Sequence, residues 1–317
     1  MTTAADRPAQ PGALLGIVGP TASGKTELAV AISRHLPVEV LVADSRQAYR
    51  GMDVGTASPD AAARAAVPHH LLDLVDPDEP FTVADWVRRA RPLVGEIAAR
   101  GRLPMLVGGT GLYVSALVDG HDYSGQAWSP ERRAVLAEEL HGNGLAPLVE
   151  RLRHLAPEVA ARTDLRNPRR VLRALERIEA GDRETPRAVP FAGPVALVAL
   201  ERPRDVLYLR IEERARRLFV ADGLLDEVRE LLRAGHGSEL RPMSGHGYHE
   251  AITHLNGEIG LEEAIERTAR RTRQYAKRQL TWFRRDPRVR WLVAGDRPAD
   301  DPALVDEAVA RLRAVLD

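Results

Sequence analysis

Short apolar runs, the second of which is interrupted only by Glu39, alternate with helical patterns along the first third of the chain. The apolar runs lie at residues 14–18, 38–43 and 103–107, and apolar positions recur at helical spacing in residues 27–36 and 83–100. Continuous apolar runs of this length are typical of buried parallel strands. Strands that alternate with amphipathic helices predict an α/β fold, here a doubly wound parallel sheet with helices on both faces.

From about Ser129 to Pro190 the pattern is helical throughout, with many Arg, Glu and Ala residues and no strand-like run. We therefore expect a helical insertion at residues 129–190, between the two parts of an α/β core at residues 13–128 and 191–317. Residues 1–12 are expected to form a disordered lead. The remaining elements of the core are expected as strands at 195–200 and 289–293 and as helices around 209–211, at 224–232 and at 261–283.

Composition restricts the class of protein. The chain has 317 residues, of which 44% are hydrophobic, and it contains no cysteine, which excludes disulfides and thiolate chemistry. No apolar run reaches the roughly 18 residues of a membrane span, and the amino-terminal segment lacks the order of a signal peptide. The 45 basic and 45 acidic side chains balance, so net charge identifies no partner. We expect a cytoplasmic enzyme that does not enter a membrane.

The segment GPTASGKT, residues 19–26, fits the phosphate-binding pattern G-x-x-x-x-G-K-[ST] and lies between a predicted strand and a predicted helix. Its glycines let backbone amides approach phosphate oxygens, the helix start adds its positive end, and Lys25 supplies a charge. Thr26 is the expected ligand of a Mg²⁺ ion that bridges two phosphates. The residues expected to bind the phosphates are Gly19, Pro20, Thr21, Ala22, Ser23, Gly24, Lys25 and Thr26. The motif alone does not tell a nucleoside triphosphate from another diphosphate.

Two further strand ends carry candidate chemistry. Asp44 ends the strand at 38–43, where its carboxylate has three possible uses: to hold Mg²⁺, to act as a general base, or to cap the next turn together with Ser45. Gln47 has an amide suited to a paired contact with adenine. Thr110 follows two glycines in VGGTGLY and can donate to an oxyanion, or it can belong to an ordinary strand-to-helix turn. Since ligands bind beyond the carboxyl ends of parallel strands, these residues are expected to converge with the glycine loop.

The long predicted helix at 261–283 carries two stripes. The apolar stripe consists of Ile265, Ala269, Thr272, Ala276, Leu280 and Phe283, and the basic stripe of Arg267, Arg271, Gln274, Arg278 and Arg285. The basic stripe contains no acid, so we expect an anion, either nucleic-acid backbone or substrate phosphate, to offset its repulsion. The alternative is an ordinary solvent face in an arginine-rich protein. His69 and His70 are expected to be structural and not metal ligands.

These motifs resemble those of the tRNA dimethylallyltransferases, also called tRNA isopentenyltransferases, which have adenylate isopentenyltransferases as relatives. The stretches that carry the resemblance occur in family order: GPTASGKT (19–26), ADSRQAYRGMDVGTA (43–57), PHHLLDL (68–74), VGGTGLY (107–113), NPRRVLRALE (167–176) and RQYAKRQLTWFRR (273–285). They span most of the chain between residues 14 and 293. The segment at 43–57 is the most specific, since ordinary nucleotide kinases lack it.

The resemblance implies a reaction. The glycine loop would hold the diphosphate of dimethylallyl diphosphate, and the five-carbon group would move to the exocyclic amine of the adenosine just 3′ of the anticodon. Asp44 would be the general base for that amine. Thr110 would stabilise the departing diphosphate with Lys25, Thr26 and Mg²⁺, and Arg214 would reach the same diphosphate.

The resemblance also implies a tRNA surface that recognises the anticodon stem-loop, with the chain acting as a monomer. Together with the basic stripe, the expected tRNA contacts are Asp44, Ser45, Arg46, Gln47, Arg133, Arg169, Arg170, Arg173, Gly247, Tyr248, Arg271, Gln274 and Arg278. Asn167 replaces the aspartate that is common in the family before its arginine pair, and His246 and His249 also differ from the usual residues.

Three other functions compete with this one. The same chemistry on free AMP, ADP or ATP would not need the helical insertion or the basic helix. A small-molecule kinase that uses ATP would leave the DSRQAY stretch, residues 44–49, unexplained. A non-catalytic RNA-binding protein is opposed by the intact glycine loop beside Asp44 and Thr110.

Overall fold

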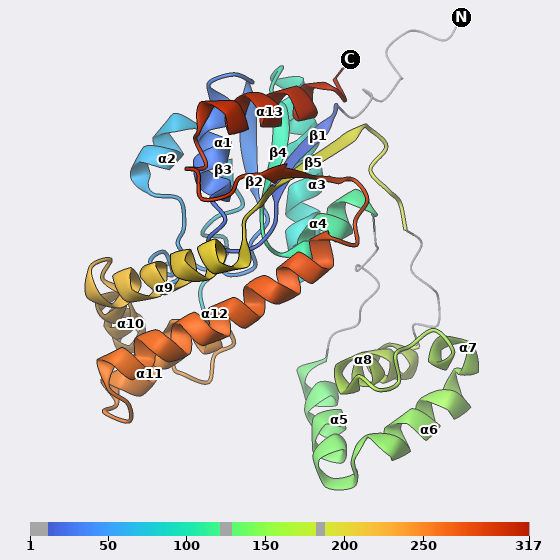
Figure 1. Ribbon diagram of the computed structural model, residues 1–317. Helices are drawn as coiled ribbons and strands as arrows, with labels where there is room; N and C mark the ends of the chain where they lie inside the picture. The colour runs from blue at the N-terminus through green and yellow to red at the C-terminus, as the bar shows by residue number, and fades with distance from the viewer. Residues whose placement is uncertain (1–11, 121–128, 182–187, 317) are drawn as a thin grey trace, which may run out of the picture. The chain divides into compact units, whose positions relative to one another are not determined.

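The computed structural model describes residues 12–120, 129–181 and 188–316. The chain divides into two compact units (Figure 1), one formed by residues 1–120 and 190–317 and the other by residues 121–189. The first unit holds the sheet and the second consists of helices over its described residues. The units are described separately below.

One parallel sheet forms the centre of the first unit, in the order β3-β2-β4-β1-β5-β6. Its strands are β1 (Leu14–Val18), β2 (Val38–Val42), β3 (His69–His70), β4 (Leu103–Gly108), β5 (Val195–Glu201) and β6 (Val289–Val293). The predicted doubly wound parallel sheet is therefore confirmed. The two histidines form the edge strand β3, which was not predicted because a two-residue strand has no periodicity of its own.

Side chains of the strands alternate between two cores, one on each face of the sheet. Leu15 and Ile17 pack with α1 (Lys25–Ser33) and α13 (Pro302–Arg313), which contact each other on one face (Figure 1). Leu14 and Val18 pack into the core of the other face. This alternation follows from the period of two residues along a strand.

The second face is covered by α3 (Val83–Ala99), α4 (Gly111–Val118), α9 (Arg204–Val220) and α12 (Leu261–Phe283). Figure 1 shows α9 and α12 side by side, and the two helices contact each other along their length. Shorter helices complete this unit: α2 (Ala61–Ala66), α10 (Leu224–Arg233), a 3₁₀ turn (Pro242–Ser244) and α11 (Tyr248–Leu255). The predicted bounds of α12 and β6 are confirmed, whereas α2, α4, α11 and α13 were not predicted.

The second unit has its own small core. Its helices are α5 (Pro130–Asn143), α6 (Leu145–Leu155), α7 (Pro157–Ala160) and α8 (Pro168–Glu179), packed around Leu136, Leu152 and Leu175. Ser129 and Asn167 cap α5 and α8 by accepting the backbone N–H of Arg132 and Arg169. Asn167 thus provides a side-chain cap where the family commonly has aspartate. Among the described helices of both units, none is long and apolar enough to cross a membrane.

Replacing Trp86 with phenylalanine tests the core under α3. The fully buried Trp86 stacks on Tyr113 with ring centroids 4.7 Å apart, and its indole N–H donates to the Val42 carbonyl at 3.0 Å. Loss of this donor and of ring volume should lower the free energy of unfolding by about 1–3 kcal/mol in urea titrations. The control Leu209→Ala removes a side chain that is 57% exposed and should change it by less than about 0.5 kcal/mol. Equal effects of the two substitutions would contradict this account.

Candidate functional site

The glycine loop joins β1 to α1 in the conformation that its motif predicts. Gly19 and Gly24 have φ angles of 126° and 103°, which other residues rarely adopt, and α1 begins at Lys25. A Cβ on Gly24 would also lie 2.5 Å from the Cβ of Ala299. Ser23 Oγ donates to the Pro20 carbonyl at 2.9 Å and so fixes the loop internally. The loop therefore leads directly into the start of a helix, where an anion binds favourably.

The ends of β2 and β4 lie beside this loop because β1, β4 and β2 are neighbours in the sheet. The Thr110 N–H donates to the Ala43 carbonyl at 3.1 Å, and Thr110 Oγ1 accepts the Ser45 N–H at 3.1 Å. Asp44 Oδ1 accepts the Arg46 N–H at 2.9 Å. The turn-capping use of Asp44 is therefore present, and it occupies one of the two carboxylate oxygens.

Gln279, on the buried face of α12, bridges the two glycine loops. Its Oε1 accepts the Thr21 N–H at 2.8 Å, and its Nε2 donates to the Gly109 carbonyl at 2.9 Å. The side chain is 4% exposed. We did not predict this bridge, although a polar residue at an apolar-stripe position of the long helix was a signal that could have indicated it.

Two open spaces meet at these residues. A cavity of about 270 Å³, here called the Asp44 cavity, is lined by Asp44, Arg46, Arg214, His246 and Tyr275 among others. A larger hollow of about 1350 Å³, here called the Lys25 hollow, runs along the glycine loop and includes Lys25 and Thr26. Asp44 and Arg214 line both spaces. A ligand could therefore reach this carboxylate and this guanidinium from either space.

The site contains two partly buried cations. Burial is the main cause that lowers the pKa of Lys25 to about 8, with the nearby Arg214 acting in the same direction and Asp44 opposing it. Burial likewise lowers the pKa of Arg214, whose Nη1 donates to Thr21 Oγ1 at 3.2 Å. Lys25 Nζ donates to the Pro20 carbonyl at 2.7 Å. An anion bound between the two cations would offset the loss of their hydration.

Arg46 and Gln47 use their donors within the protein. Arg46 Nη1 donates to the carbonyls of Arg241 and Pro242 at 2.9 and 2.8 Å. Gln47 Nε2 donates to the carbonyls of Thr56 and Ala57 at 3.1 and 3.0 Å. The expected paired contact of Gln47 with adenine thus conflicts with this structure, in which the amide nitrogen is already engaged and the amide oxygen is the group that remains for a ligand.

Gly247 and Tyr248, which were expected to contact tRNA, are buried in the protein and do not lie at its surface. Tyr248 is 1% exposed, and its hydroxyl donates to Glu227 Oε1 at 2.7 Å. His246 stacks near Tyr275 with ring centroids 5.3 Å apart, and burial lowers the pKa of His246 to about 4. Burial raises the pKa of Tyr275 to about 12. Both rings are therefore uncharged near neutral pH and give the Asp44 cavity a partly aromatic wall.

Two of the four arginines in the basic stripe of α12 are neutralised by acidic residues of the protein itself. Arg267 pairs with Glu263, and Arg271 Nη1 lies 2.5 Å from Oε1 of the buried Glu250. The expectation that an external anion must balance the whole stripe was therefore wrong for these two residues, because their acidic partners lie on the previous turn and on α11. Gln274 and Arg278 are exposed, and the Arg278 guanidinium lies 5.6 Å from the ring centroid of Tyr275. Arg278 also lines the Asp44 cavity.

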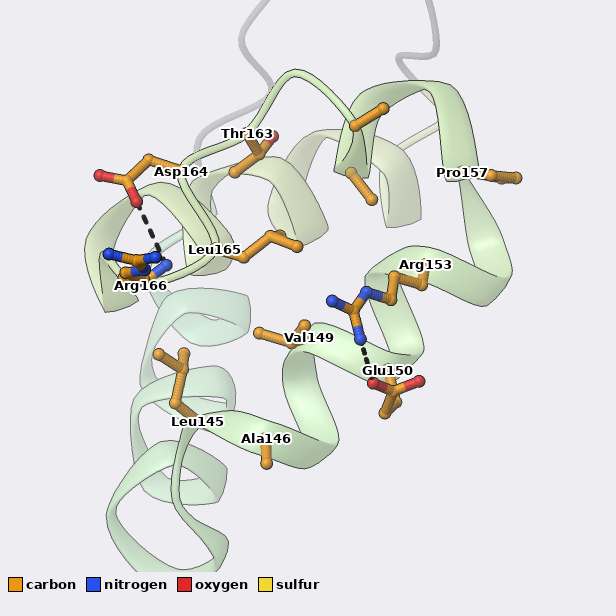
Figure 2. Close-up of a pocket in the computed structure, with 12 residues that line it drawn as sticks. Leu145, Ala146, Val149, Glu150, Arg153, Pro157, Thr163, Asp164, Leu165 and Arg166 are labelled. Atoms are coloured by element: carbon orange, nitrogen blue, oxygen red, sulfur yellow. Dashed lines mark hydrogen bonds and ion pairs between the residues drawn. The ribbon is translucent and has the colours of Figure 1, made fainter.

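Within the second unit, Arg133 and Arg173 both pair with the buried Glu176, at 2.7 and 2.9 Å. Arg169 and Arg170 are exposed on α8. Figure 2 shows an open hollow of about 1110 Å³ in this unit, between α6, α7 and residues 163–166. None of the arginines expected to contact tRNA lines this hollow.

Comparisons with known proteins identify the family of this chain. The family models of IPP transferase and isopentenyl transferase match residues 47–286 and 12–67. The tRNA dimethylallyltransferase of Syntrophobacter fumaroxidans is 45% identical over 88% of this chain and 83% of its own length. That of Roseiflexus castenholzii is 43% identical over 96% of this chain and 98% of its own. This chain belongs to the IPP transferase family.

A solved structure extends this result to the fold of the IPP transferase family. The crystal structure of the tRNA isopentenylpyrophosphate transferase from Bacillus halodurans is 40% identical to this chain, covers 96% of each chain, and aligns with a TM-score of 0.71. The resemblance inferred from the motifs is thereby confirmed. The family favours transfer of a prenyl group over the transfer of phosphate from ATP.

The pKa of Lys25 leads to a testable pH dependence. The ammonium is charged below a pKa of about 8 and loses its charge above it, so binding of an anion must take up a proton at higher pH. Affinity for inorganic diphosphate should therefore fall between pH 8 and 9.5, by up to about tenfold per pH unit. Calorimetry across this range measures the slope. Lys25→Met, measured in the same buffers, corrects for titration of diphosphate itself, and an equal slope in this variant would exclude Lys25 as the cause.

Proposed function

We propose that this protein transfers the dimethylallyl group of dimethylallyl diphosphate to the exocyclic amine of the adenosine 3′-adjacent to the anticodon in tRNA. The observation that carries the proposal is the meeting of the Lys25 hollow and the Asp44 cavity at Asp44 and Arg214. One space is suited to a diphosphate and the other to an adenine base. Membership of the IPP transferase family and the names of the relatives support the same reaction.

The chemistry requires stabilisation of the leaving group. The bond between the allylic carbon and the diphosphate oxygen breaks, a bond from that carbon to the adenine nitrogen forms, and diphosphate departs with the bonding electrons. Lys25, Arg214 and the amides of the glycine loop are fixed before the reaction, so they stabilise the developing charge without rearrangement. Thr110 lies next to this loop through Gly109 and Gln279, and we assign its hydroxyl to the diphosphate as well.

The amine that attacks must lose a proton. Asp44 is assigned as the general base, because it lines both spaces and only its Oδ1 is engaged by a backbone N–H. Among the described residues no hydrogen bond to Asp44 Oδ2 is found, which leaves that oxygen for the proton. The target base would have to leave the anticodon loop to reach this carboxylate, as in other enzymes that act on bases.

A Mg²⁺ ion fits the donor set. Thr26 supplies a hydroxyl in the Lys25 hollow, and the described residues contain no group of three or more acidic, histidine or cysteine side chains that would form a protein-only metal cage. Mg²⁺ is usually held by one or two protein oxygens together with water and substrate phosphate. When bound, the ion would neutralise charge on the diphosphate, with Thr26 as its protein ligand.

The tRNA contacts are assigned to both units. Arg169 and Arg170 on α8, and Gln274 and Arg278 on α12, are exposed and can contact phosphate or base. Arg170 Nη1 also lies 3.9 Å from Oδ2 of the exposed Asp164. Arg133, Arg173 and Arg271 form ion pairs with acidic residues of the protein. They would contribute to tRNA binding through their positive charge near the surface, and not through an unpaired guanidinium. Ser45, Arg46 and Tyr248 line the Asp44 cavity and would act by shaping it. Gln47 would act from the Lys25 hollow, and Gly247 at the start of α11, where it precedes Tyr248. We propose that the chain acts as a monomer, and a tRNA substrate supports a cytoplasmic location.

A transfer assay with three acceptors tests the reaction. Labelled dimethylallyl diphosphate and Mg²⁺ are offered with unmodified tRNA, AMP or ATP in parallel. We expect label in tRNA alone, since a free nucleotide is too small to need the exposed arginines of α8 and α12 for binding. Label in AMP or ATP would instead identify an adenylate isopentenyltransferase, and consumption of ATP without transfer would identify a kinase.

Replacing Asp44 with asparagine tests the general base. The amide keeps an oxygen for the Arg46 N–H but cannot accept the proton, so kcat for transfer should fall by about 10²- to 10⁴-fold. The dissociation constants of tRNA and of diphosphate should change far less. Single-turnover transfer and filter binding measure the two quantities. Near-normal turnover in this variant would remove Asp44 from the role of base.

A further inference from the structure

Glu227, on α10, lies outside every motif considered above and binds a loop of the site. Its Oε2 accepts the backbone N–H groups of Asp53 and Val54 at 2.8 and 2.6 Å. Its Oε1 accepts the Gly55 N–H at 3.1 Å and the Tyr248 hydroxyl at 2.7 Å. Consecutive backbone N–H groups that point to one side form an anion-binding concavity. Here a carboxylate of the protein itself occupies that concavity.

The same loop, residues 53–57, is held from its other side by its carbonyls. The Thr56 carbonyl accepts from Gln47 Nε2 at 3.1 Å and from Arg214 Nη2 at 3.5 Å. The Ala57 carbonyl accepts from Gln47 Nε2 at 3.0 Å. The loop therefore connects Glu227, which binds its N–H groups, to Gln47 and Arg214, which bind its carbonyls.

Tyr248 sets the position of this loop by contact as well as by its hydroxyl. A Cβ on Gly55 would lie 2.4 Å from Cε2 of Tyr248, so the ring packs directly against the glycine backbone. Tyr248 is 1% exposed, so its ring is enclosed by the protein on all sides. Glycine at position 55 allows the loop to approach close enough for its N–H to reach Glu227.

The loop also forms a wall of both spaces. Gly55 and Thr56 line the Asp44 cavity, and Asp53, Thr56 and Ala57 line the Lys25 hollow. We propose that Glu227, assisted by Tyr248, is a positioning residue that fixes loop 53–57 and thereby orients Arg214 toward the diphosphate. This role rests on the proposed function, since it concerns the same reaction. Glu227 itself does not contact substrate.

Glu227→Gln tests the proposal. The glutamine amide has one acceptor oxygen. If its nitrogen faces Asp53 and Val54, both of these hydrogen bonds are lost; if it faces Gly55 and Tyr248, the Gly55 bond is lost while the Tyr248 hydroxyl can turn to accept. Hydrogen exchange of the amides of residues 53–55 should accelerate by about tenfold or more, with other regions unchanged. The KM for dimethylallyl diphosphate should rise or kcat should fall by about tenfold, through Arg214, while the dissociation constant of tRNA stays within about twofold. The matched control is Glu230→Gln, an exposed glutamate on the same helix, which should change none of these.

Tyr248→Phe gives a second, milder test that removes one hydrogen bond and keeps the ring. Exchange at Gly55 should accelerate by about threefold, in the same direction as for Glu227→Gln. Unchanged hydrogen exchange at residues 53–55 in both variants would disprove the proposal that Glu227 and Tyr248 fix loop 53–57. Faster hydrogen exchange with unchanged transfer kinetics would show that Glu227 stabilises the loop without affecting the reaction, and this result would overturn its role as a positioning residue. Hydrogen exchange does not depend on which substrate the enzyme uses. A result that disproves the fixing of loop 53–57 by Glu227 is therefore distinguishable from a result that disproves the proposed function.

Discussion

The backbones of β2 and β4 come so close at their carboxyl ends that residue 108 has no room for a side chain. A Cβ on Gly108 would lie 2.1 Å from the Ala43 carbonyl oxygen. This approach allows the Thr110 N–H to bond Ala43 and its hydroxyl to receive the Ser45 N–H. Asp44 lies between these two contacts in the chain. The position of the proposed base therefore depends on a steric constraint of the sheet, before any interaction with substrate.

The long helix α12 transmits that constraint to the glycine loop. Gln279 satisfies Thr21 and Gly109 with one buried amide, so the two loops cannot separate without leaving polar groups unpaired. The same helix presents Tyr275 and Arg278 to the Asp44 cavity. Its arginines belong mostly to ion pairs within the protein, which leaves a smaller set for RNA than their number in the sequence indicates. The helix is thus part of the site's frame as well as of its surface.

The two cations of the site are held at a cost in hydration. Burial lowers the pKa of both Lys25 and Arg214, and Asp44 is the acidic residue that acts most strongly on each. A multiply charged anion would interact with both cations and offset the hydration that they lose on burial, whereas a neutral ligand would not. Arg34, Arg64, Arg210 and Arg217 also line the Lys25 hollow, so Lys25 and Arg214 belong to a larger group of cations around this space.

The sequence by itself determined the glycine loop, the parallel sheet, the bounds of α12 and the family, because these are expressed in local patterns of spacing. It also indicated that Asp44 and Thr110 would converge with the loop, since neighbouring strand ends meet at one edge. Only the tertiary structure decided the partners of polar side chains. Gln279 and Thr21 are 258 residues apart, and Glu227 and Asp53 are 174 residues apart. Contacts over such separations leave no periodic signal. Glu250, the partner of Arg271, lies on α11 and was hidden for a similar reason, whereas Glu263, the partner of Arg267, lies four residues earlier on α12 and was visible in the sequence.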